Sequence, residues 1–145
     1  NSIAHAHPMY GKTFSTLGKT LDPISQDSCA FYERTALFAD YDGVANGPDE
    51  GINIAKALGE KDFVILQNHG ILTTGTMVDT TIWYFLNMED DCKSQLLAEA
   101  VGKPIIIPHE TACATRDYVA NDLSAYVSFQ PTVDVLWEEE PDLLD

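Results

Sequence analysis

Residues 2–8 read Ser2-Ile3-Ala4-His5-Ala6-His7-Pro8, a short run of small and apolar residues that carries two histidines and ends in proline. In an extended strand, residues i and i+2 point to the same face. His5 and His7 can therefore direct their imidazoles to one point, and neutral imidazole is the commonest protein ligand of divalent transition metals. His-x-His is a short motif, so alone it leaves open a metal site and a pair of ordinary surface or core residues.

A third histidine, His69, follows the apolar run Phe63-Val64-Ile65-Leu66. A continuous apolar run of this length predicts a strand that is buried on both faces, and residues 71–74 predict the strand that returns beside it. His69 then lies at the tip of a hairpin, where ligands tend to face a cleft. Gly70 is expected to allow the tight turn, and Asn68 either orients an imidazole or only serves the turn. We expect His5, His7 and His69 to meet in space.

Capping residues and apolar periodicity predict five helices in the rest of the chain. They span about 8–17, 23–34, 48–58, 77–101 and 110–120, with the turn Asn46-Gly47 before the third and a capping box of Thr76 and Asp79 before the fourth. The apolar face of the fourth helix is expected to comprise Val78, Ile82, Phe85, Cys92, Leu96 and Ala100. A short strand is predicted over 35–39, and 105–107 is either an edge strand or an extended connector.

Two lysines flank the first predicted helix, Lys12 and Lys19. Backbone N–H groups are free where a helix begins, so the junction at His7 and Pro8 is a place where an anion is favoured. The two lysines either help to hold an anionic substrate or are ordinary surface residues.

Several other charged residues are interpreted as ordinary surface. Asp49 and Glu50 are acids of a helix start, where the macrodipole favours them, rather than a catalytic pair. Residues 89–91, Glu-Asp-Asp, are expected to form a solvated helix face, with a subunit contact as the alternative. His109 is expected to be a surface residue at a helix start, without a paired ligand.

The overall composition excludes several classes of function. The 145 residues include 8 Lys and Arg against 23 Asp and Glu, a net charge of −15, which argues against binding to nucleic acid or to an anionic membrane surface. No apolar run approaches the ~20 residues of a membrane span, and no signal peptide is visible. The odd number and wide spacing of Cys29, Cys92 and Cys113 favour a reducing, cytoplasmic location.

The motifs, taken in order, resemble the class II aldolase/adducin family. The resemblance rests on His5-Ala6-His7, on residues 11–32 and 43–59, and on Leu66-Gln67-Asn68-His69-Gly70-Ile71-Leu72. It runs from about Ser2 to Ala100, and the loops are most similar to fungal members without an assigned function.

This resemblance implies an α/β fold, a three-layer α/β/α sandwich around a largely antiparallel central sheet. It also implies that the chain corresponds to the C-terminal part of the usual domain, over 1–137, followed by an acidic tail over 138–145. The first strands, the phosphate-binding loops and the acidic residue that transfers protons would lie upstream, so no residue of this chain is named as catalytic. Family members form ring-like tetramers, which implies a homotetramer or another homo-oligomer.

The resemblance further implies that His5, His7 and His69 hold a metal, with zinc as the default and manganese, iron or cobalt as alternatives. In the metal-dependent members the ion stabilises an enediolate as a bond in a hydroxy-carbonyl or sugar-like small molecule breaks. We therefore expect a lyase, epimerase or dehydratase. The alternative is an adducin-like oligomerisation or interaction module without catalysis. The adducin heads lack the three histidines, so their retention here favours an enzyme.

Overall fold

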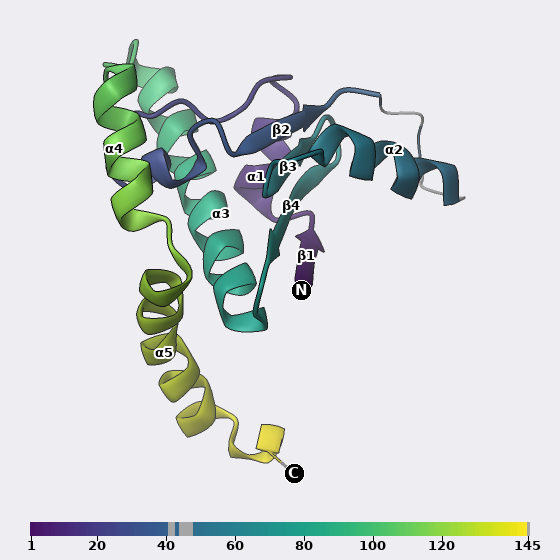
Figure 1. The fold of residues 1–145 in the computed structure, drawn as a ribbon, viewed down its shortest axis with the longest axis vertical. Coiled ribbons are helices and arrows are strands. Elements are labelled where there is room, and N and C mark those ends of the chain that lie inside the picture. The colour runs from purple at the N-terminus through teal and green to yellow at the C-terminus, as the bar shows by residue number, and fades with distance from the viewer. Residues whose placement is uncertain (41–42, 44–47, 145) are drawn as a thin grey trace.

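A four-stranded sheet forms the centre of the molecule (Figure 1). The computed structural model describes residues 1–40, 43 and 48–144, so the turn predicted at 46–47 lies outside the described residues. The strands β1 (Ser2–Ala6), β2 (Thr35–Phe38), β3 (Phe63–Leu66) and β4 (Gly70–Gly75) stand in the order β1-β4-β3-β2. The pairs β1–β4 and β3–β4 are antiparallel and β2–β3 is parallel. The sheet is thus largely antiparallel, as predicted.

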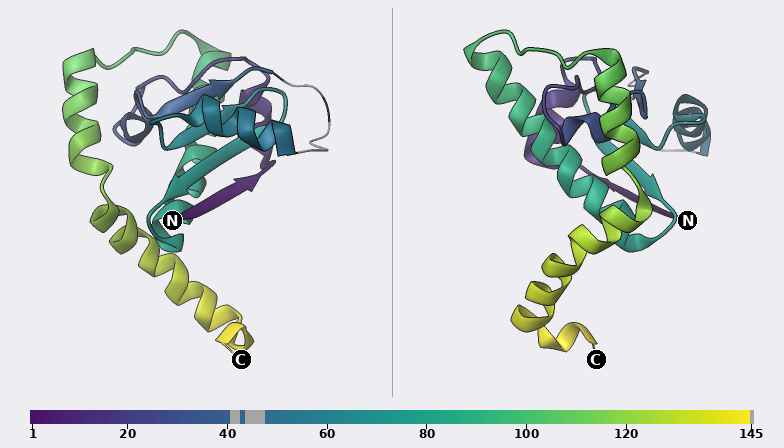
Figure 2. Two further views of the ribbon diagram at one scale, coloured as in Figure 1. Left: turned by 45° about the vertical axis from the view of Figure 1, so that its right-hand side comes forward. Right: turned by 60° about the vertical axis from the view of Figure 1, so that its left-hand side comes forward.

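Helices cover both faces of this sheet. The helices α1 (Met9–Ser15) and α3 (Val78–Val101) lie on one face, and α2 (Pro48–Leu58) lies on the other (Figures 1 and 2). Alternate residues of β3 point to opposite faces of the sheet. Phe63 and Ile65 belong to the core under α1 and α3, while Val64 and Leu66 pack towards α2. Both faces of β3 are therefore buried, which explains its continuous apolar run. The predicted α/β fold with three layers is confirmed.

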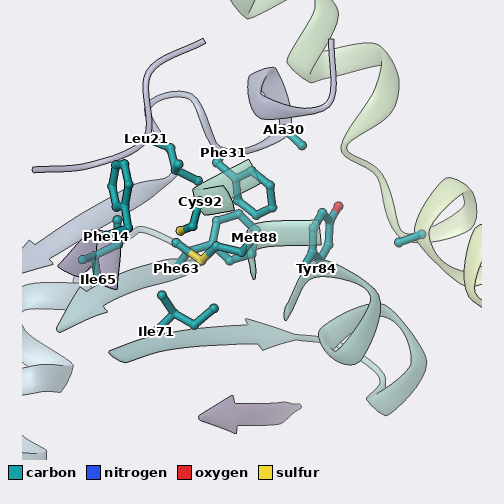
Figure 3. Packing of buried hydrophobic residues seen from close by; sticks show 11 residues of the cluster. Phe14, Leu21, Ala30, Phe31, Phe63, Ile65, Ile71, Tyr84, Met88 and Cys92 are labelled. Carbon is teal, nitrogen blue, oxygen red and sulfur yellow. The ribbon is translucent and has the colours of Figure 1, made fainter. Parts of the chain in front are cut away.

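The larger core lies between the sheet and α3 (Figure 3). The Phe31 and Phe63 rings meet edge to face with centroids 5.0 Å apart, and the Tyr84 ring lies 5.0 Å from that of Phe63. Met88 and Phe14 are fully buried beside them. One aromatic cluster thus joins β3 and α3 to the segment that contains Phe31.

The remaining elements lie towards the C-terminus and beside the core. A 3₁₀ helix, η1 (Ser28–Phe31), contacts α4 (His109–Val119), and α5 (Asp122–Glu139) packs against α3 and then extends away from the sheet (Figure 2). The chain ends in a second 3₁₀ helix, η2 (Pro141–Leu144). Residues 105–107 form an extended connector, as one of the two alternatives predicted. None of the described helices has the length and apolar character needed to cross a membrane.

Two helix predictions were wrong. Only η1 forms within 23–34, because the Ser28 hydroxyl accepts hydrogen bonds from the backbone N–H groups of Ile24 and Ser25, each at 2.9 Å, and so holds a turn in place of a helix. The capping box also fails. Met77 occupies the cap position of α3 without a side-chain bond, and the Thr76 hydroxyl donates instead to Asp122 at 2.7 Å.

The predicted apolar face of α3 was also partly wrong. The residues that α3 buries are Thr80, Thr81, Tyr84, Met88, Asp91, Cys92 and Gln95, whereas Val78 is 65% exposed. The buried face of α3 is offset by about one residue from the predicted apolar face, because polar side chains of α3 form hydrogen bonds with neighbouring segments. Gln95, for example, accepts the backbone N–H of Asp22 and donates to its carboxylate.

The solvated face predicted over 89–91 holds only for Asp90. Glu89 accepts the backbone N–H groups of Tyr10 and Gly11 at 2.9 and 2.5 Å, so its carboxylate fills the start of α1. Asp91 is only 6% exposed, beneath the segment that contains Ser25. The anion predicted at the start of α1 is thus an internal carboxylate, and Lys19 is paired with Asp22 and Glu99.

Candidate metal centre

The three predicted histidines converge at one end of the sheet. His5 lies in β1, His7 follows β1 directly, and His69 lies in the turn between β3 and β4. Their ring centroids are 5.1 Å apart for His5 and His7, 5.0 Å for His5 and His69, and 4.4 Å for His7 and His69. One ring nitrogen of each lies within 4.8 Å of the others. Their predicted meeting is observed, whereas their role as metal ligands stays a prediction.

Strand register brings the histidines together. In the β1–β4 ladder His5 is opposite Leu72 and Ala6 is opposite Ile71, so His7 comes next to Gly70. The turn of residues 67–69 then places His69 beside His7. The registers of β4 with β1 and with β3 therefore determine where all three histidine side chains lie.

Gly70 matters for a different reason from the one predicted. The left-handed conformation in this turn belongs to Asn68, with φ of 58°, a residue type that tolerates it. A Cβ on Gly70 would lie 2.5 Å from the Ala6 carbonyl oxygen and 3.0 Å from Cδ2 of His7. Glycine is required at this position because β1 approaches the backbone of β4 so closely.

A backbone hydrogen bond orients His5. Its Nδ1 lies 2.9 Å from the carbonyl oxygen of Ile71, so Nδ1–H donates and Nε2 keeps a free lone pair. This arrangement, with one ring nitrogen held by the backbone, is usual for imidazoles that bind metals. His5 and His7 are exposed and His69 is half-buried, so the site is open to small molecules.

The electrostatic environment favours the neutral form of His69. Burial lowers the pKa of His69, and the neighbouring His7 and His5 lower it further, while the charge of Glu50 opposes these effects. Glu50 lies in the first turn of α2, and no pattern in the sequence indicated that its carboxylate would act on this site. The side chain of Asp49 lies outside the described residues.

The residues present fit a divalent transition metal. Three imidazole nitrogens are the protein ligands of a catalytic zinc site, in which further positions stay open for water or substrate. Within the described part of the chain, no cysteine, carboxylate or fourth histidine joins the group. A closed structural site would normally have four protein ligands.

Residues 1–96 match the family model of the Class II Aldolase and Adducin N-terminal domain. The chain belongs to this family. Among curated relatives, the Decarboxylase NovR of Streptomyces niveus is 37% identical over 142 residues, which cover 98% of this chain and 53% of the relative. The Meiotically up-regulated gene 14 protein of Schizosaccharomyces pombe is 39% identical over 132 residues, which cover 89% and 51%.

A solved structure supports the same assignment. The L-fuculose 1-phosphate aldolase from Glaciozyma antarctica superimposes with a TM-score of 0.85 at 39% identity, over 97% of this chain and 53% of that one. The chain thus spans about half the length of each of these three proteins. Their names include a decarboxylase and an aldolase, so family membership alone does not select the reaction.

Proposed function

We propose that this protein is a metal-dependent lyase of the aldolase type that acts on a hydroxy-carbonyl or sugar-like small molecule. The observation that supports it is the convergence of three imidazole nitrogens at an open site, with the ring of His5 held by the Ile71 carbonyl. The similarity to an L-fuculose 1-phosphate aldolase supports the same class of substrate.

The roles of the residues follow from this geometry. His5, His7 and His69 would hold a divalent ion, with zinc first and manganese, iron or cobalt as alternatives. When bound, such an ion supplies Lewis-acid stabilisation of negative charge that develops on a substrate carbonyl oxygen. The Ile71 carbonyl fixes the ring of His5, and burial lowers the pKa of His69, which favours its neutral form. We assign no residue of this chain as the general acid or base.

The second candidate is an adducin-like oligomerisation or interaction module, since the matching family model includes adducin. Retention of all three histidines favours the enzyme, because an interaction module does not require a metal site with open coordination positions. We also propose a homo-oligomer, with a homotetramer as the first expectation from the family. The three free cysteines support a reducing compartment such as the cytoplasm.

Metal content tests the proposal. The protein is purified without chelator and analysed for metals beside the variants His69→Ala and Gln67→Ala, two changes in the same turn. We expect His69→Ala to lose one ion per chain relative to the wild type and Gln67→Ala to keep it. Activity is then assayed with aldols, ketoses and their phosphates.

Two results would contradict the proposal. A His69→Ala protein with the full metal content would exclude this residue as a ligand. A metal-depleted variant that keeps full activity on the substrate found would exclude metal-dependent catalysis. The interaction module predicts instead a wild type without the ion and an oligomer that survives chelation.

A further inference from the structure

A second cluster of metal-ligating side chains lies where α4 meets the segment before β2. Its members are Glu33, His109 and Cys113, and one donor atom of each lies within 4.8 Å of the others. Glu33 precedes the start of β2, whereas His69 follows the end of β3. Because β2 and β3 are parallel and in register, the cluster and the three histidines lie at opposite ends of the sheet.

The distances within this cluster approach those of a tetrahedral zinc site. Zinc binds sulfur near 2.3 Å and nitrogen near 2.0 Å, so two such ligands lie about 3.5 Å apart. Sγ of Cys113 is 3.8 Å from Nδ1 and 3.9 Å from Nε2 of His109, and 3.8 Å from Oε2 of Glu33. These separations from the sulfur are about 0.3–0.4 Å longer than in such a site. The sulfur is almost equidistant from the two ring nitrogens, so the His109 ring must also turn before one nitrogen faces the ion.

Helix geometry and an unusual backbone conformation create the cluster. His109 and Cys113 are four residues apart in α4, so they share one face of the helix. Glu33 has φ of 60°, in the left-handed region, which costs a residue other than glycine about 1–2 kcal/mol. Its carboxylate pairs with Nη1 of Arg116 at 3.3 Å, but an exposed ion pair contributes only about 0–1 kcal/mol.

We propose that Glu33, His109 and Cys113 form a second divalent-metal site that ties α4 to the segment between η1 and β2. A thiolate, an imidazole and a carboxylate together suit Zn²⁺ and similar ions. The two anionic ligands balance the charge of the ion. The positive charge of Arg116, 3.3 Å from the Glu33 carboxylate, opposes a cation, so the site binds more weakly than one without it.

Tyr32 positions His109 in this site. Its hydroxyl lies 3.1 Å from Nδ1 of His109. When Nδ1–H donates to the phenolic oxygen, Nε2 keeps its lone pair for an ion, 3.9 Å from the Cys113 sulfur. Loss of such an outer partner typically lowers metal affinity about 10–100-fold.

Cobalt distinguishes this site from the three histidines, because only a cysteine ligand produces a thiolate-to-cobalt charge-transfer band in the near ultraviolet. The reduced protein is titrated with Co²⁺ beside the variants Cys113→Ser, His69→Gln and Tyr32→Phe. We expect the band in the wild type and in His69→Gln, its loss in Cys113→Ser, and a 10–100-fold weaker affinity in Tyr32→Phe. Zinc should raise the melting temperature of His69→Gln but not that of the double variant with Cys113→Ser.

The proposal is overturned by any of three results. The first is the absence of the band in the wild type although a thiol assay of the unfolded protein finds all three cysteines reduced. The second is a band that persists in Cys113→Ser and so belongs to Cys29 or Cys92. The third is loss of the band in His69→Gln. Circular dichroism verifies folding of each variant, and His109→Ala, at a side chain that is 62% exposed, repeats the test if Cys113→Ser does not fold.

Discussion

The replacement of Gly70 by alanine tests how the strands build the three-histidine site. The new methyl group would lie 2.5 Å from the Ala6 carbonyl oxygen and 3.0 Å from Cδ2 of His7. An ordinary contact begins at 3.4 Å, so β1 must recede from β4 by about 0.9 Å. His7 follows β1 directly and moves with it.

This displacement is large on the scale of metal coordination. Ligand distances in a metal site hold to about 0.2 Å, so a shift several times larger removes His7 from the set or strains the protein when the ion binds. Overpacking of this kind costs about 1–3 kcal/mol. Because 1.4 kcal/mol is a factor of ten in affinity, we expect Gly70→Ala to bind Zn²⁺ about 5- to 140-fold more weakly.

Gly75→Ala provides a matched control on the same strand. Its methyl group would collide with the hydroxyl groups of Thr81 and Thr80, at the end of β4 away from the histidines. We expect both variants to lose about 1–3 kcal/mol in urea unfolding, and only Gly70→Ala to lose zinc affinity in a competition titration with a chelator. If Gly70→Ala is destabilised yet binds zinc as tightly as Gly75→Ala, the reasoning about β1 and the site is refuted.

Two further predictions concern buried acids of α3. Burial raises the pKa of Asp91 to about 7 from 3.8, so the folded state keeps a proton that the unfolded state releases. Stability should therefore fall as pH rises from about 4 to about 7, by at most about 4 kcal/mol. Urea unfolding of Asp91→Asn should lack this fall, and an unchanged pH profile would contradict it. Glu89→Gln should cost about 1–2 kcal/mol of unfolding free energy, because α1 loses a charged acceptor of two N–H groups; an equal stability of Gln and Glu would exclude that role.

The sequence predicted the three-histidine site because a simple rule governs each of its steps. The alternation of residues in β1 places His5 and His7 on one face, and the four apolar residues of β3 define a buried strand whose end carries His69. After a short turn, the chain runs back antiparallel to β3 as β4, which lies between β3 and β1. The pairing of β1 with β4, and not with another strand, was not predicted from the sequence and is given by the structure.

The errors in α3 arose where side chains bond to segments far away in the chain. Glu89 was assigned to solvent because charged residues usually mark the exposed face of a helix. Its partners at Tyr10 and Gly11 lie 79 and 78 residues away, and no local period encodes them. Asp91 is buried by the same kind of long-range packing, beneath Ser25 and 66 residues from it. The failed helix over 23–34 has a local cause, since a serine hydroxyl competes for the backbone N–H groups there.

The two histidine-containing clusters differ in how their side chains are placed. His69 is positioned by a β-sheet, whose register repeats every two residues and so can be extrapolated from sequence. His109 was expected to lack a paired ligand, because its neighbours Tyr32 and Glu33 belong to a connection with no repeating pattern. The one local signal was Cys113, four residues further along the same helix, and a pair at that spacing needs a third group before it indicates a metal. A site whose ligands share a sheet is therefore accessible to sequence reasoning, whereas one assembled between a helix and a connection requires the structure.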